Sequence, residues 1–178
     1  NVVLGERMAA LLASEQVPEA SVRVIHNWSD GVAIRPVAPA DNALRAQWGL
    51  GERFVVAYSG NMGRAHEFDT IVGAARQLAR DPRIVFLFIG DGHGKPALEQ
   101  AVKGLPNVQF RPYQPREMLG QSLTAPDVHL ISLRPELEGL IVPSKFYGVM
   151  AAGRAALFIG APDGEVPRIL AEHGCGHT

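Results

Sequence analysis

Residues 54–89 read F-V-V-A-Y-S-G-N-M-G-R-A-H-E-F-D-T-I-V-G-A-A-R-Q-L-A-R-D-P-R-I-V-F-L-F-I. This stretch places a helix-like segment between two short apolar runs. Residues 54–59 and 84–89 are nearly continuous apolar hexapeptides, which is typical of strands buried on both faces. Between them, residues 66–80 carry apolar side chains at helical spacing, and an Asp-Pro pair follows. A strand, a helix and a second strand at this spacing predict a βαβ unit of a parallel sheet.

The same alternation continues on both sides of this unit. Helices are expected at residues 4–15, 41–49, 95–103, 115–123, 144–152 and 163–173. Further strands are expected at residues 21–26, 108–110, 127–133 and 155–159, and residues 27–39 read as a linker or long loop. The pattern predicts an α/β fold with a doubly wound, Rossmann-like parallel sheet, whose ligands bind at the carboxyl ends of its strands.

Composition limits the classes of function. The chain has 178 residues, enough for one domain with a substantial core, and 47% of them are hydrophobic. A net charge of −1 gives no electrostatic reason to expect nucleic acid or an anionic membrane surface as a partner. The single cysteine, Cys175, excludes an internal disulfide and fits a reducing compartment.

Two glycine-rich turns follow the first two strands of this unit, and glycines let backbone N–H groups approach an anion closely. In the second turn the glycine spacing departs from the dinucleotide fingerprint, and no acidic residue ends the next strand, so a dinucleotide site is not expected. Tight structural turns, and a solvated lysine in the second, are the alternatives. The candidate residues are Gly60, Asn61, Met62, Gly63 and Arg64 in the first turn and Gly90, Gly92 and Lys95 in the second.

Two later loops carry further candidates. Tyr113 and Gln114 offer a ring face and polar groups to a nucleobase, or they belong to a loop braced by prolines. Carboxylates such as Glu136 and Glu138 can bind sugar hydroxyls or stabilise an oxocarbenium-like carbon, with two solvated acids as the alternative. The segment after them, with a helix start suited to an anion, contributes Gly139, Leu140, Ser144 and Lys145.

Other conspicuous residues are interpreted as structural. His173 and His177 flank Cys175 in H-G-C-G-H, but the glycines there favour a helix end and its turn over a metal site. His129 lies within an expected strand and is interpreted as a core residue. Trp28 and Trp48 are interpreted as packing residues. No metal ligand set is expected.

Four pieces of the sequence stand out together, in this order: V-I-H-N-W-S-D (24–30), Y-S-G-N-M-G (58–63), F-I-G-D-G (88–92) and V-P-S-K-F-Y-G-V-M-A-A-G-R (142–154). As a set they resemble the donor-binding half of glycosyltransferases of the GT-B fold. The similarity points to the large retaining group that builds bacterial capsule, exopolysaccharide and lipopolysaccharide sugars. It implies that residues 1–20 end an N-terminal domain and its linker, and that residues 21–178 form a C-terminal nucleotide-sugar-binding domain cut before its end.

The resemblance also implies roles for individual residues. The loop 60–64 would face the diphosphate, with Ser144 and Lys145 beside it, and Lys95 would lie near the nucleotide. Tyr113 and Gln114 would border the base. Glu138, Gly139 and Leu140 would lie by the donor sugar and phosphates, with Glu138 as the catalytic candidate. Departures from the family pattern are Asn61 where an arginine is common, Gly148 where a glutamate normally binds the ribose, and Ala155-Ala156 for Pro-Val.

The implied activity is transfer of a hexose, with retention, from a UDP- or GDP-linked sugar to a glycan or lipid-linked acceptor. No cofactor or metal is implied. The acceptor would bind through the N-terminal domain, so this chain alone would bind donor without turnover. The implied location is the cytoplasm or the inner face of the cytoplasmic membrane. Two alternatives stay open: a nucleotide-sugar 2-epimerase of the same fold, and a non-catalytic sugar-nucleotide-binding module.

Overall fold

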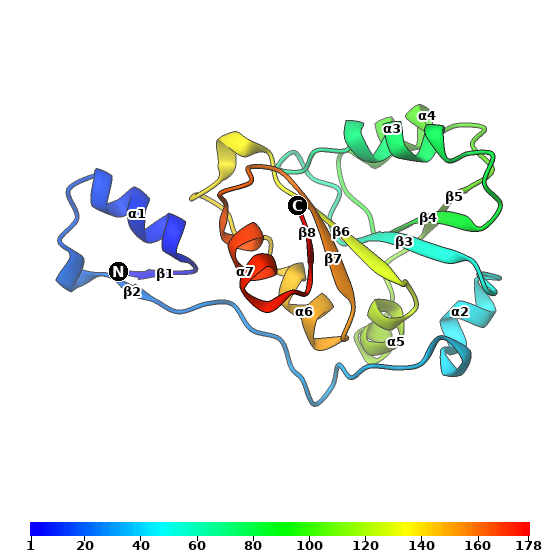
Figure 1. The fold of residues 1–178 in the computed structure, drawn as a ribbon, viewed down its shortest axis with the longest axis horizontal. Helices are drawn as coiled ribbons and strands as arrows, with labels where there is room; N and C mark the ends of the chain where they lie inside the picture. The colour runs from blue at the N-terminus through cyan, green and yellow to red at the C-terminus, as the bar shows by residue number, and fades with distance from the viewer.

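A computed structural model describes residues 1–178, and a six-stranded parallel sheet forms its centre (Figure 1). The strand order is β5-β4-β3-β6-β7-β8, and every neighbouring pair is parallel. Chain order therefore reverses between β3 and β6, which is the point where doubly wound sheets bind ligands. The strands are β3 (Phe54–Ser59), β4 (Ile84–Ile89), β5 (Val108–Arg111), β6 (Val128–Ser132), β7 (Ala155–Ile159) and β8 (Gly176–His177).

Helices cover both faces of this sheet (Figure 1). On one face, α3 (Asp69–Gln77) and α4 (Lys95–Ala101) pack against alternate residues of β3 and β4, such as Tyr58 and Phe88. On the other face, α2 (Ala43–Gln47) covers the intervening residues of the same strands. The helices α6 (Lys145–Ala151) and α7 (Glu165–His173) cover β6 and β7 there, with α5 (Leu119–Thr124) nearby. None of these helices combines the length and apolar character needed to cross a membrane.

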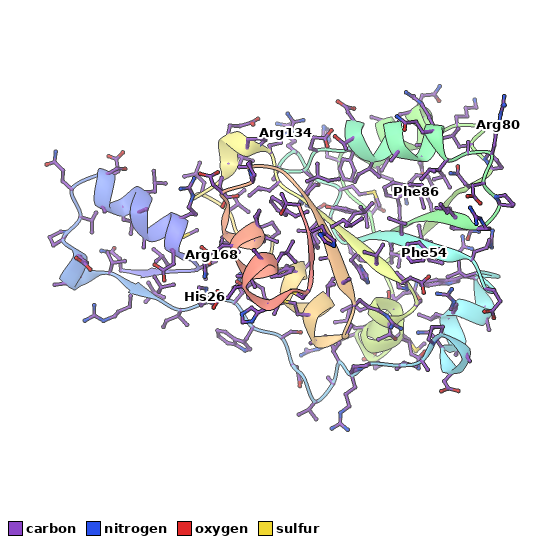
Figure 2. The ribbon with its side chains drawn as sticks, viewed as in Figure 1. His26, Phe54, Arg80, Phe86, Arg134 and Arg168 are labelled. Carbon is purple, nitrogen blue, oxygen red and sulfur yellow. The ribbon has the colours of Figure 1, made fainter.

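The first residues form a small unit beside the main sheet, in which β1 (Val2–Val3) pairs in parallel with β2 (Arg23–Val24) and α1 (Glu6–Ser14) connects them. The buried carboxylate of Glu165 attaches this unit to α7, because it accepts the backbone N–H of Glu6 at 2.8 Å and of Arg7 at 3.4 Å. Arg168 donates to the same carboxylate at 2.6 Å. Figure 2 shows His26 and Arg168 at this junction.

Most expected elements are found, with four differences. The expected strand 21–26 shortens to β2 and pairs with β1, outside the main sheet. The helix expected at 66–80 begins only at Asp69, because residues 60–68 are held as a loop. The helix expected at 115–123 begins as a 3-10 turn, Arg116–Met118, before α5. The C-terminal turn expected at 174–178 includes β8, where Gly176 lies so close to Ala156 that a Cβ would meet its carbonyl oxygen.

His129 is fully buried in β6, as predicted, and it makes stability depend on pH. Its Nε2–H donates to the carbonyl oxygen of Leu123 at 2.9 Å, and burial lowers its pKa to about 4. Between the folded-state pKa and the ordinary value of 6.5, the unfolded chain binds one more proton than the folded chain. Stability should therefore fall as pH drops from 6.5 to 4, by about 3 kcal/mol from this residue.

Urea unfolding of His129→Gln across this pH range tests the expectation. In His129→Gln, the slope of unfolding free energy against pH should decrease by the amount that corresponds to about one proton. His173→Gln, at an exposed position, should keep the wild-type slope. An unchanged slope in His129→Gln would assign the acid sensitivity to other groups.

Candidate functional site

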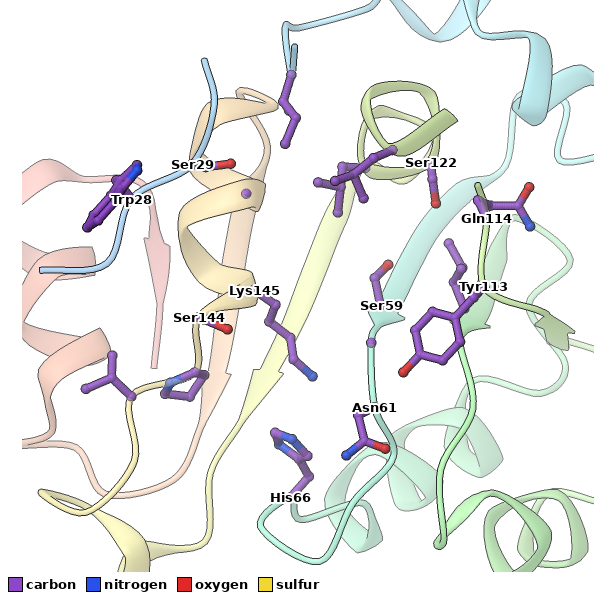
Figure 3. A pocket seen from close by; sticks show the side chains of 18 of the residues that line it. Trp28, Ser29, Ser59, Asn61, His66, Tyr113, Gln114, Ser122, Ser144 and Lys145 are labelled. Atoms are coloured by element: carbon purple, nitrogen blue, oxygen red, sulfur yellow. The ribbon is translucent and has the colours of Figure 1, made fainter. Parts of the chain in front are cut away.

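A cavity of about 600 Å³ lies at the carboxyl edge of the sheet, where the strand order reverses. Its walls come from the ends of β3 and β4, the loop after β5, α5, and the start of α6 (Figure 3). Residues of the linker, Trp28, Ser29 and Ile34, close one side. No aspartate or glutamate lines the cavity, whereas Lys145 and His66 do. The only lining group that could carry a negative charge is the phenol of Tyr113.

Lys145 is the cation of this cavity. It follows Ser144 at the start of α6, and its Nζ donates to the hydroxyl of Tyr58 at 2.5 Å. Gly60 makes room for it, because a Cβ there would lie 3.1 Å from Nζ. None of the ion pairs in the chain includes Lys145. Burial lowers the pKa of Lys145 to about 7, since no carboxylate offsets the loss of water around the ammonium.

His66 lies beside Lys145 and points into the same cavity (Figure 3). Its Nδ1–H donates to the carbonyl oxygen of Ser132 at the end of β6, at 2.7 Å. Burial and the charge of Lys145 lower the pKa of His66, so the ring is neutral at pH 7. The hydroxyl of Ser59, also at the cavity, is buried without a protein partner and is thus a further polar group for a ligand.

The two glycine turns pack against each other. The N–H of Gly60 donates to Ile89 O and that of Met62 to Asp91 O, both at 2.8 Å, so these two donors are used inside the protein. Gly90 has a positive φ of 132°, and a Cβ there would lie 2.2 Å from the carbonyl oxygen of Gly60. Gly92 is also crowded, because a Cβ there would lie 2.6 Å from atoms of Asn61 and Met62. The glycines of the second turn are therefore required for close packing of the first.

The structure brings six predicted residues to the cavity: Gly60, Asn61, Tyr113, Gln114, Ser144 and Lys145. Met62 belongs to the same loop, but its side chain is fully buried in the core. Gly63 and Arg64 line a second cavity of about 320 Å³, which shares only His66 with the first.

The remaining predicted residues lie outside the main cavity. Lys95 Nζ is 4.0 Å from Glu99 on its own helix, and Glu136 lies 3.9 Å from Arg134. Leu140 is more than half exposed, and Gly139 has a positive φ of 83° and approaches the backbone of α1.

Glu138, the catalytic candidate, has a structural partner. Its Oε1 accepts the backbone N–H of Glu165 at the start of α7, at 3.0 Å. Gly164 lies so close to this carboxylate that a Cβ would collide with it. The side chain thus caps a helix, and it does not line the cavity.

Several cavity residues were not predicted. Trp28 was interpreted as a packing residue, but its side chain is 81% exposed and lines the cavity, whereas Trp48 is packed as expected. The sequence did offer one indication that Trp28 is exposed, because it lies in a linker without apolar periodicity. Gly148 also lines the cavity, at the position where the family pattern has glutamate. No group of three or more His, Cys, Asp or Glu side chains is placed to hold a metal ion.

Comparison of sequences relates the chain to bacterial glycosyltransferases. No protein-family model matches it. The chain is 35% identical over 135 residues to the Escherichia coli protein named as the colanic acid biosynthesis glycosyl transferase WcaI, an alignment that covers 74% of this chain and 33% of WcaI. It is 34% identical over 182 residues to the Pseudomonas aeruginosa glycosyltransferase WbjE, covering 98% of this chain and 44% of WbjE. The chain thus spans less than half of these relatives.

Comparison of structures identifies the fold. HepE of Anabaena, crystallised with UDP and glucose, matches with a TM-score of 0.76 at 21% identity, over 99% of this chain and 48% of HepE. WaaG, a glycosyltransferase of lipopolysaccharide biosynthesis, matches with a TM-score of 0.72 at 14% identity, over 98% of this chain and 47% of WaaG. The C-terminal domain of LpcC from Francisella tularensis matches with a TM-score of 0.59 at 20% identity, over 79% of this chain and 74% of that domain.

The chain therefore has the Rossmann-like fold of one half of a GT-B glycosyltransferase. Its sequence is similar to those of the bacterial glycosyltransferases WcaI and WbjE, and its fold also matches the C-terminal domain of LpcC.

Proposed function

We propose that the cavity binds the nucleoside diphosphate part of a sugar donor. The observation that carries this proposal is the ammonium group of Lys145, which lies in a cavity without acidic residues and has no ion-pair partner. A buried cation without a counter-charge is costly, and a diphosphate would supply the missing charge. Tyr113 and Gln114, at the other side of the cavity, supply a ring and an amide for the base (Figure 3).

UDP is the nucleoside diphosphate that we expect to bind, because HepE was crystallised with UDP and with UDP-glucose. Thermal unfolding of the chain with UDP, GDP, ADP, dTDP and CMP tests this. A ligand at about 100 times its Kd adds about 2.7 kcal/mol to stability, which gives a clear rise in Tm. UDP should stabilise and CMP, which lacks a diphosphate, should not. A Tm unchanged by all five nucleotides would contradict the proposal.

For a protein of the full length of WcaI or WbjE, we propose retaining transfer of a hexose to a glycan or lipid-linked acceptor. Lys145 would stabilise the charge that develops on the leaving diphosphate, and acceptor groups would come from outside the matched region. The name of WcaI, which assigns that protein to colanic acid biosynthesis, supports exopolysaccharide synthesis as the process served. We propose the cytoplasm, or the inner face of its membrane, as the location. Labelled UDP-glucose with full-length protein should give labelled glycan; an epimer formed without acceptor would instead indicate an epimerase.

A further inference from the structure

We propose that Tyr58 is a positioning residue for anion binding, and that its hydroxyl group holds the ammonium of Lys145 against the loop after β3. The inference rests on the proposed binding of a nucleoside diphosphate. Tyr58 does not line the cavity, so it acts through Lys145 and not by contact with the ligand.

The hydroxyl of Tyr58 acts both as a hydrogen-bond donor and as an acceptor. It donates to the carbonyl oxygen of Asn61 at 2.7 Å and accepts from Lys145 Nζ at 2.5 Å. One oxygen thus joins α6 to the loop after β3, two segments that lie 87 residues apart in sequence. The ring of Tyr58 is fully buried, with edge-to-face contacts to His66 and Phe68 at centroid distances of 5.5 and 4.9 Å. The hydroxyl therefore has a fixed position.

Lys145 needs such a partner because a lysine side chain is flexible. Four rotatable bonds must be ordered before the ammonium can meet a phosphate, and ordering them during binding weakens affinity. In this structure the bond to Tyr58 is the hydrogen bond made by Nζ, and Nζ also lies 3.7 Å from the centroid of the same ring. The tyrosine thus orders the ammonium in advance of the ligand.

The charge state of Lys145 should also make the affinity for the diphosphate depend on pH. The titratable groups near it are Tyr58 on β3, His66 in the following loop, Tyr113 after β5 and His129 on β6, and none is a carboxylate. The ammonium form binds the diphosphate, so affinity should fall as pH rises above about 7, the pKa to which burial lowers Lys145. A hydroxyl that accepts from the ammonium favours the charged form, so its removal should lower this pKa further.

Tyr58→Phe is the test, because it keeps the ring and removes the hydroxyl. UDP binding should be measured by calorimetry from pH 6 to 9. We expect roughly tenfold weaker binding at pH 8, from the loss of a hydrogen bond to a charged group. We also expect the decline of affinity to begin at a lower pH than in the wild type. The ionisation of UDP itself is common to both proteins and cancels in the ratio of their affinities.

Tyr147→Phe is the matched control. Tyr147 lies on α6, two residues from Lys145, and its buried hydroxyl has no partner, so its loss should change neither affinity nor pH profile. Wild-type affinity and profile in Tyr58→Phe would overturn the inference, while binding by the wild type would still support the proposed function. A uniform loss at every pH would show a structural role only. Absence of UDP binding in the wild type would overturn both proposals.

A measurement on the wild type covers the case in which Tyr58→Phe does not fold. The ¹⁵Nζ resonance of Lys145 should show a through-space contact to the ring protons of Tyr58 in the ligand-free protein. Absence of this contact would overturn the inference, because the ammonium would then not be held in place before binding.

Discussion

Lys145→Met should lower the affinity of the chain for UDP by about 100-fold or more and leave the domain at least as stable as the wild type. The loss of affinity follows because charge-assisted bonds to a phosphate are worth about 1.5–3 kcal/mol each. No other cation lines the cavity at neutral pH, since His66 is neutral there. Nothing near the ligand would therefore replace the missing charge.

The stability of the same variant should change in the opposite direction. The pKa of Lys145 is lowered by burial, so the folded protein holds the ammonium less readily than the unfolded chain does. Between about pH 7 and the ordinary value of 10.5, the unfolded chain binds more protons, and wild-type stability gains from this residue as pH rises. Methionine removes that pH dependence and the burial cost at neutral pH.

Lys103→Met is the matched control. Lys103 is exposed after α4 and does not line the cavity, so its replacement should leave both UDP affinity and stability unchanged. Calorimetry with UDP and urea unfolding give the two measurements. UDP affinity equal to that of the wild type in Lys145→Met would exclude this lysine from the binding site. A large loss of stability would mean that it serves the fold instead.

The sequence alone locates the sheet and the edge that carries the site. The apolar hexapeptides at 54–59 and 84–89 define β3 and β4 to the residue, because strands buried on both faces admit few polar side chains. Once the strands are parallel, their carboxyl ends share one edge. That rule is enough to predict that Gly60, Tyr113 and Lys145 lie in one cavity, although they come from three different loops.

Side-chain direction is the part that the sequence does not determine. The spacing of Glu136 and Glu138 fits a sugar site and a solvated loop equally well. Glu138 in fact binds the start of α7, 27 residues further along the chain, and only the packing of that helix decides this. The exposure of Trp28 likewise depends on the path of a linker that has no regular structure. Contacts made by irregular segments have no periodicity from which to predict them.

Arg45→Met should destabilise the domain by about 3–5 kcal/mol, the usual cost of breaking a buried ion pair on one side. Arg45 is only 6% exposed. Its guanidinium donates to Asp127 Oδ2 at 3.1 Å and to three backbone carbonyls, those of Gly51, Arg53 and Ala125, at 2.6–3.1 Å. Methionine would leave these acceptors without a donor inside the protein. The carboxylate of Asp127 would keep only the N–H of Val55, at 2.7 Å.

Arg83→Met is the control, because it breaks an arginine–aspartate ion pair with a similar N–O distance at a solvent-exposed position. Arg83 lies 2.7 Å from Asp81, and its side chain is 83% exposed. Water solvates both groups once the pair is broken, so the urea midpoint of Arg83→Met should stay close to that of the wild type. Equal losses in the two variants would show that burial does not set the cost of breaking these pairs. A large loss in Arg45→Met alone would show that the guanidinium joins α2 to the starts of β3 and β6, the two strands between which the proposed donor site lies.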